Sequence, residues 1–391
     1  MTRPELSLFV FCDAFGWRLL NEHSFMEDVL TVRAPVDTVL GYSSTCVPTI
    51  LTGRHPHEHG HFAFFRYDPA SSPFSSFKAL ELLPRSVTSR GRVRRWISKL
   101  VQRWHGYTGY FQLYDVPWGR LPDLDYTEKK DLYEEGGINN GCPTIFDRLR
   151  EAKLRFHVSD WRKPEEHNLR SLLHALEHDR PVFAYLYLAH LDGVMHQYGS
   201  RSEQAATKIA WYDQQLRKIL ERAHELYSDV RLHLISDHGM ADVDRTVNLM
   251  ARIDALGLRY GKDYAAVYDS TMARFWFLED GIERRVREAL AEEPLGRVVE
   301  DDELVDLGCN FEGKTHGELI FLVEPGVMIV PSFMGGSSLA GMHGYVPSDI
   351  DGRASFAATH APETMPAHLT DHHELMWSEA CRAAGTDFDR D

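Results

Sequence analysis

The sequence lacks any stretch that approaches the roughly eighteen consecutive apolar residues of a membrane-spanning helix. Its apolar N-terminal run, LSLFVFC at residues 6–12, is too short for the core of a signal peptide and suits a buried strand. We therefore expect no membrane span and, by default, a cytoplasmic protein.

Cysteine and positive charge are also scarce. The five cysteines are scattered and form no CxxC pair, which excludes a zinc-finger pattern and a disulfide framework and is typical of a reducing compartment. Lys and Arg number 43 against 58 Asp and Glu, so the net charge is −15. Binding to duplex nucleic acid rests on cationic side chains and is not expected.

The chain does contain apolar runs separated by helical patterns. Runs at 6–12, 181–193 and 230–240 read as buried parallel strands, and residues 202–226 place apolar side chains on one face of a helix. Residues 144–161 read as a helix that runs into a further strand. This alternation predicts an α/β fold with a largely parallel sheet and helices on both faces.

Two segments interrupt the alternation. Residues 62–140 are rich in aromatics and predict an inserted cap, and residues 251–331 predict a small α+β subdomain. The predicted core of the single domain is then 1–61, 141–250 and 332–391. The cap carries a basic tract that is either a clamp for an anion or a solvated helix face; it comprises Arg85, Arg90, Arg92, Arg94, Arg95, Lys99 and Arg103.

Aspartates and histidines follow the predicted strands. Asp13 ends the first run, Asp192 and His196 lie four residues apart after the second, and Asp237-His238 end the third. Ligands bind at the carboxyl ends of parallel strands, so these side chains are expected to converge. One such aspartate alone would be read as a helix N-cap. Three aspartates with three histidines, counting loop residue His343, indicate a metal site.

These motifs resemble those of the alkaline phosphatase superfamily, in its nucleotide pyrophosphatase/phosphodiesterase branch. FCDAFG, SSTCVPTILTGRHPHEHG, LDGVMHQYG, SDHGM and GMHGY occur in the family's order over residues 11 to 345. The resemblance implies two divalent metal ions, one held by Asp192, His196 and His343 and the other by Asp13, Asp237 and His238. A mixed Asp/His shell suits Zn²⁺, with Mn²⁺ as the alternative.

The resemblance also implies a hydroxyl nucleophile ten residues before the glycine of a Thr-Gly pair. Counting back from Gly53 gives Ser43, and Thr45 is the rival if the loop is two residues shorter. A sulfatase is disfavoured, because the Cys-x-Pro-x-Arg motif would require arginine where Ile50 stands. Of the neighbouring histidines, His59 is expected to be structural.

The sequence departs from the family in its phosphate-binding side chains. Relatives often carry an asparagine three residues after the nucleophile, where Cys46 stands here. No counterpart of the phosphate-binding arginine of the monoesterases is identifiable, and Arg54, Arg66 and Arg274 all remain open as substitutes. Preference for monoesters or diesters is therefore not predicted.

The main functional expectation is a metal-dependent phosphoric-ester hydrolase that forms a phosphoserine intermediate on a phosphodiester or nucleotide-like small molecule. A phosphotransferase, a phosphonate hydrolase or a phosphomonoesterase could use the same site. A non-catalytic binding protein with this fold is the alternative from a different class. The sequence indicates no oligomeric state.

Overall fold

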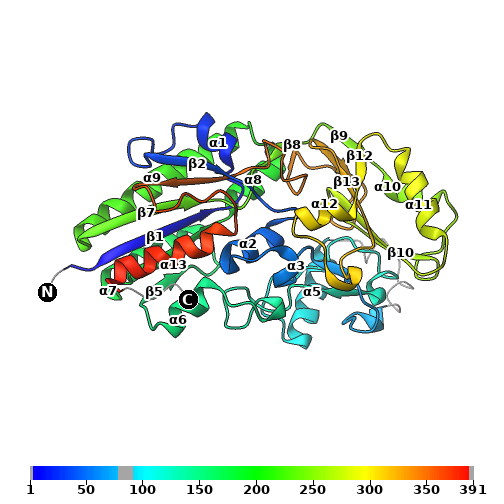
Figure 1. Cartoon of the computed structure of the whole chain (residues 1–391), viewed down its shortest axis with the longest axis horizontal. Coiled ribbons are helices and arrows are strands. Elements are labelled where there is room, and N and C mark those ends of the chain that lie inside the picture. Colours follow the sequence, from blue (N-terminus) through cyan, green and yellow to red (C-terminus); the bar gives the residue numbers. More distant parts are fainter. Residues whose placement is uncertain (1–2, 78–90, 387–391) are drawn as a thin grey trace.

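A six-stranded sheet forms the centre of the computed structural model, which describes residues 3–77 and 91–386 (Figure 1). Its order is β2-β16-β7-β1-β6-β5. β1 pairs in parallel with β6 and β7, and β5 with β6, whereas β16 is antiparallel to both neighbours. The strands are β1 (Glu5–Cys12), β2 (Val32–Val36), β5 (Phe156–Val158), β6 (Phe183–Leu188), β7 (Asp229–Ile235) and β16 (Ala354–Ala358). The expected α/β fold is confirmed.

Helices cover both faces of this sheet because successive side chains of β1 point in opposite directions. Leu8 and Val10 pack against α1 (Trp17–Glu22), α7 (Glu165–His178), α8 (His190–Tyr198) and α9 (Glu203–Leu226). Phe9 and Phe11 pack against α2 (Ser43–Thr52), α6 (Ile145–Glu151) and α13 (Asp371–Ala384). The apolar face predicted for α9 is buried except at Leu226, which is only partly buried.

A four-stranded antiparallel sheet lies at the other end of the molecule (Figure 1). Its order is β10 (Tyr264–Tyr268), β11 (Met272–Phe277), β13 (Leu319–Val323) and β12 (Gly296–Val299). It falls within the segment for which an α+β subdomain was expected. Three short helices accompany it: α10 (Leu249–Asp254), α11 (Ile282–Ala291) and α12 (Asp301–Asp306).

The aromatic-rich segment 62–140 packs on this second sheet. Its side chains Phe65 and Phe111 share one hydrophobic cluster with Tyr264 and Phe275. Its described elements include β3 (Phe65–Tyr67), paired antiparallel with β4 (Leu124–Tyr126), and the helix α5 (Gly91–His105). Other short elements of the described chain include α3 (Pro56–His59), β8 (Ala241–Asp242), β9 (Arg245–Val247), β14 (Val327–Ile329) and β15 (Gly341–Met342).

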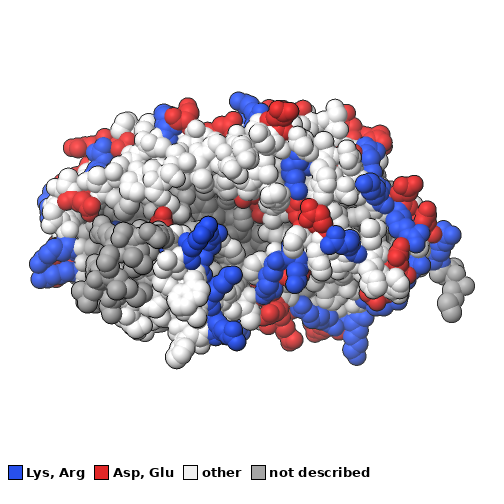
Figure 2. Space-filling model, turned by 180° about the vertical axis from the view of Figure 1, so that it is seen from behind, with Lys and Arg blue, Asp and Glu red and all other residues white. Residues whose placement is uncertain are grey.

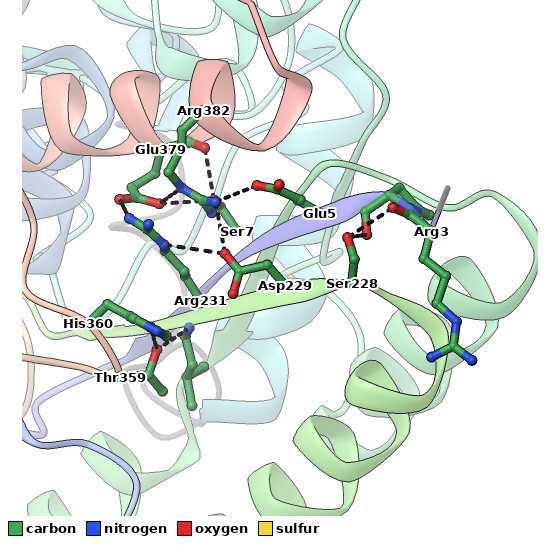
Figure 3. Close-up of polar contacts among 12 residues, drawn as sticks. Arg3, Glu5, Ser7, Ser228, Asp229, Arg231, Thr359, His360, Glu379 and Arg382 are labelled. Atoms are coloured by element: carbon green, nitrogen blue, oxygen red, sulfur yellow. Dashed lines mark hydrogen bonds and ion pairs between the residues drawn. The ribbon is translucent and has the colours of Figure 1, made fainter. Parts of the chain in front are cut away.

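Ion pairs fasten α13 to the amino ends of β1 and β7 (Figure 3). The guanidinium of Arg382 lies 2.7 Å from Glu5 Oε2 and 3.0 Å from Asp229 Oδ2. Glu379 accepts from Arg382 at 2.8 Å and from Arg231 at 3.1 Å. This network leaves the opposite, carboxyl edge of the sheet open for a site. Among the described residues, no helix is long and apolar enough to cross a membrane.

A buried histidine makes the stability of this fold depend on pH. Burial lowers the pKa of His372, in α13, to about 4. The unfolded chain takes up this proton near pH 6.5, so stability is lost as pH falls from about 6.5 toward 4. At about pH 5 the loss attributable to this group is about 2 kcal/mol.

We expect His372→Leu to reduce, by about 2 kcal/mol, the difference in unfolding free energy between about pH 8 and pH 5. Urea unfolding at the two pH values measures it. The matched control is His224→Gln, at an exposed position of α9, which should keep the wild-type difference. An unchanged difference in His372→Leu would contradict the assignment.

Candidate active site

The six predicted metal-binding residues come from four places in the chain and meet at the carboxyl edge of the main sheet. Asp13 follows β1 directly. Asp192 and His196 lie one turn apart in α8, just after β6. The Asp237-His238 pair follows β7, and the remaining histidine, His343, follows β15. Because β6, β1 and β7 are adjacent and parallel, their carboxyl ends lie side by side.

Short distances join these side chains into two groups. Asp192 Oδ1 lies 3.3 Å from His196 Nε2 and 3.5 Å from His343 Nε2. His238 Nε2 lies 3.2 Å from Asp237 Oδ2 and 3.7 Å from Asp13 Oδ1. The rings of His238 and His343 stack with centroids 3.7 Å apart.

Two sets of three ligand atoms are compact enough to hold an ion. One is Asp192, His196 and His343, as expected, and the other is Asp13, Asp192 and His238. Asp192 therefore lies within reach of both groups, a feature that the sequence did not indicate. Asp237 stands beside the second set through its contact with His238.

Backbone carbonyls orient two of the imidazoles. Nδ1 of His196 lies 2.8 Å from the carbonyl oxygen of Gly341, and Nδ1 of His238 lies 2.9 Å from that of Gly239. A carbonyl oxygen only accepts, so each Nδ1 carries a proton, and a deprotonated Nε2 would present its lone pair toward the carboxylates. This is the tautomer that a metal-binding histidine requires.

The three carboxylates lie close together and have too few hydrogen-bond donors around them. Asp13 Oδ1, Asp192 Oδ1 and Asp237 Oδ2 are buried and have no hydrogen-bond partner among the described residues. Burial, together with the charges of Asp237 and Asp192, raises the pKa of Asp13 well above its usual value. Burial also raises the pKa of Asp192, although His196 opposes it. Uncompensated carboxylate oxygens of this kind are what a bound cation would satisfy.

The two competing hydroxyls of the nucleophile loop differ in their surroundings. Ser43 is the first residue of α2, and its Oγ lies 3.0 Å from His238 Nε2. Thr45 is fully buried and its hydroxyl donates to the carbonyl oxygen of Phe62. No side chain caps α2, and its first two residues, Ser43 and Ser44, line the cavity described below, so the N–H groups at this helix end have no side-chain acceptor.

The histidine-rich tract after α2 lies outside this cluster. His59 is buried and its Nε2 lies 3.0 Å from the hydroxyl of Thr49. His61 is buried and accepts from the backbone N–H of Asn139. The other two, His55 and His57, are exposed. None of the four lines the cavity described next.

A cavity of about 470 Å³ opens in front of Ser43, Asp13 and Asp192. Figure 2 shows a hollow near the middle of that face of the molecule. Aromatic rings dominate the walls: Tyr42, Phe64, Tyr110, Tyr114, Tyr133, Trp161 and Tyr187. No lysine or arginine is among the described lining residues.

The arginines considered as phosphate ligands are engaged elsewhere. Arg274 is fully buried and bonds Asp269 at 2.9 Å, and Arg66 bonds Asp125 at 3.0 Å. Arg54 is mostly exposed and faces Glu58. In the basic tract, Arg85 and Arg90 lie outside the described residues, and the other five members do not line the cavity. The described part of the tract is therefore not a clamp for a substrate in this cavity.

The sequence reasoning missed Glu128, a carboxyl group in the wall of the cavity. Burial raises its pKa to about 8, and it accepts from the backbone N–H of Tyr110 at 3.1 Å. Nothing in its local sequence marks it, because tertiary packing alone brings it to the site. The aromatic richness of 62–140 was the available signal for the rings around it.

The family model for type I phosphodiesterase / nucleotide pyrophosphatase matches residues 8–346. The chain belongs to this family. Family membership makes it a phosphodiesterase-type hydrolase, as expected from the motifs. No curated protein sequence matches it.

Solved structures of relatives share the fold over nearly the whole chain. Murine ectonucleotide pyrophosphatase/phosphodiesterase 5 is 18% identical with a TM-score of 0.69, and the match covers 99% of this chain and 97% of that one. The human protein of the same name is 16% identical with a TM-score of 0.68, covering 98% and 96%. An inactive variant of the murine protein in complex with AMP is 17% identical with a TM-score of 0.67, covering 99% and 97%.

Because the carboxylates are crowded, we expect part of the site to destabilise the folded protein when no cation is bound. Asp13→Asn removes one buried charge and keeps an acceptor oxygen. We expect it to raise the unfolding free energy in chelator-containing buffer by about 1–3 kcal/mol near pH 7.5. Because the folded-state pKa of Asp13 is raised, this cost grows as pH rises above about 3.8, so the gain should shrink near pH 4. Denaturant unfolding at both pH values measures it; a loss of stability at both would contradict it.

Proposed function

We propose that this hydrolase cleaves nucleotide-like phosphodiesters with two divalent metal ions and Ser43 as the nucleophile. The observation that carries the proposal is the position of the Ser43 hydroxyl, at the start of α2 and 3.0 Å from His238, beside carboxylate oxygens that lack partners. Zn²⁺ suits the mixed Asp/His set, and Mn²⁺ is the alternative.

The metal-binding residues and Ser43 would have different roles in the reaction. Two divalent ions bound by the six Asp and His side chains would lower the pKa of an alcohol and neutralise charge that develops on the phosphate. Ser43 would attack phosphorus as the bond to the leaving alcohol breaks, and water would then hydrolyse the phosphoserine. The N–H groups at the start of α2 would donate to the phosphate oxygens.

The residues in the cavity walls favour a phosphodiester substrate that carries an aromatic group. A phosphomonoester carries about two negative charges near neutral pH, and the described lining holds no cationic side chain to meet the second. The rings of Tyr110, Tyr114 and Trp161 offer faces on which a nucleobase could stack. The complex of the murine relative with AMP supports a nucleotide ligand.

Loss of a proposed ligand should remove metal and activity together. We expect Asp237→Ala and His238→Ala to lower hydrolysis of bis-p-nitrophenyl phosphate at least about 100-fold and to reduce bound metal. The control is His57→Ala, at an exposed position of the histidine-rich tract after α2, which should change neither turnover nor bound metal. Turnover and metal content by mass spectrometry test this. Equal losses in all three variants would reject the ligand assignment.

The choice of nucleophile is tested by two single-atom changes. Ser43→Ala should abolish the burst of p-nitrophenol and lower turnover at least about 1000-fold, while bound metal is retained. Thr45→Val removes the rival hydroxyl and should cost about 1–3 kcal/mol of stability, because the carbonyl of Phe62 loses its donor, yet keep turnover. The reverse pattern would assign the reaction to Thr45. The murine structure with AMP is of an inactive variant in which a threonine is replaced by alanine, which supports a hydroxyl role in the family.

A further inference from the structure

The inner face of α5 is fully engaged with the rest of the protein. The buried guanidinium of Arg94 donates to the carbonyl oxygens of Tyr114 and Val116 at 2.7 and 2.8 Å and lies over the ring of Trp118. Ser98 Oγ accepts from the backbone N–H of Leu113 at 3.0 Å. These contacts fix α5 in place, so its outer face is not needed to hold the fold.

The outer face of α5 carries an exposed apolar band. Trp96, Leu100 and Trp104 follow one another at four-residue spacing and therefore line up along the helix. Their exposed fractions are 63%, 47% and 86%. Trp104 is the most exposed of the large apolar side chains in the described chain. Two tryptophans in solvent on one helix mark a contact surface better than scattered single apolar residues do.

A basic band runs beside the apolar one. It consists of four exposed side chains of α5, Arg92, Arg95, Lys99 and Arg103. None of the four forms an ion pair with a described residue, and α5 itself contains no acidic residue. Figure 2 shows blue side chains next to a white area at the lower left, where the turn from Figure 1 brings this part of the molecule.

Another amphipathic surface helix, α11, shows the usual arrangement. There Arg284 lies 2.9 Å from Glu288 and Arg287 lies 3.3 Å from Glu283, both within the same helix. The four cations of α5 thus have no ion-pair partner among the described residues, in a chain whose net charge is −15. The partner that complements them must be anionic, and the partner that covers two tryptophans and a leucine must be apolar.

We propose that α5 binds the surface of a membrane that contains anionic phospholipids. Helices that lie in the membrane interface combine a basic band with tryptophan and leucine, and tryptophan favours the depth of the lipid headgroups. The cations meet the phosphate groups, and the apolar band enters the boundary with the acyl chains. An acidic protein surface would complement the charges, but it gives no reason for the exposed tryptophans.

Binding there would also bring the active site to the membrane. α5 holds the segment that contains Tyr110 and Tyr114, two rings of the cavity wall, through Arg94, Ser98 and Gln102. The cavity and the proposed contact face are thus built on one fixed unit of the fold.

Sedimentation of the full-length protein with vesicles tests the proposal. We expect binding to phosphatidylcholine vesicles that contain about 30% phosphatidylglycerol, weak binding to phosphatidylcholine alone, and release as salt rises. Tryptophan fluorescence should shift to shorter wavelength on binding.

Two double variants test the basic band and the apolar band separately. Arg95→Glu with Lys99→Glu should lower the partition coefficient more than about tenfold, since each cation near an anionic surface accounts for about fivefold. Trp96→Ser with Trp104→Ser should abolish the fluorescence shift and weaken binding to a similar extent. Both pairs lie on the exposed face, so circular dichroism should match that of the parent.

The matched control is Arg284→Glu with Arg285→Glu on α11, the same change of charge on a helix without tryptophan, which should bind vesicles like the parent. Equal binding of all variants, or equal binding to neutral vesicles, would overturn the proposal. Concentration-dependent dimers that Trp104→Ser dissociates, without vesicle binding, would assign the face to a second copy of the chain and also overturn it.

Discussion

Repulsion among three crowded carboxylates is the constraint on which the site depends. Asp13, Asp192 and Asp237 come from three neighbouring positions at one sheet edge, and each keeps an oxygen without a donor. Such an arrangement is unfavourable by itself, because burial and like charge both oppose ionisation. It persists because β1, β6 and β7 are locked in parallel register by two hydrophobic layers, so that the side chains have no freedom to separate.

The same constraint explains the division of the molecule into two ends. Ion pairs around Arg382 and Glu379 are at the amino edge of the sheet, where solvent can screen them and oppositely charged partners are available. Among the described residues that line the cavity at the carboxyl edge, the charged side chains apart from histidines are carboxylates, and many of the others are aromatic. A low-dielectric cover strengthens every electrostatic interaction inside the cavity. The fold therefore concentrates its unfavourable electrostatics at the place where an ion or substrate would relieve it.

Local patterns predicted the central sheet and the convergence of the aspartates and histidines. Apolar runs, helical spacing and strand-end aspartates are properties of short segments, and the parallel topology that follows from them places Asp13, His196 and His238 together. The different surroundings of Ser43 and Thr45 were not predictable in this way, because the hydroxyl of Thr45 donates to the carbonyl oxygen of Phe62, which approaches from outside the helix. The shared position of Asp192 likewise depends on side-chain geometry.

The cap was the least predictable part for the same reason. Its walls are formed by segments without regular secondary structure that single contacts hold in place. Examples are the hydrogen bonds from the backbone N–H of Tyr110 to Glu128 and from the guanidinium of Arg94 to the carbonyl oxygen of Tyr114. The basic tract was predicted as a unit, but the structure splits it: Arg94 turns inward and serves the fold, and its neighbours turn outward. Helical periodicity could separate the faces of α5, whereas only the packed structure shows which face is inside.

Different parts of this cavity would therefore recognise different parts of a substrate. Because no cationic side chain is among the described lining residues, negative charge on a substrate would be met by the proposed cations at the carboxylate-histidine cluster and by the first turn of α2. The rest of the substrate would meet aromatic rings and the carboxyl groups of Asp269 and Glu128. The raised pKa of Glu128, about 8, lets it be protonated at neutral pH and donate a hydrogen bond. A neutral donor between aromatic faces selects by shape and hydrogen bonding. Chemistry at the cluster and selection in the cap can therefore vary independently in this fold.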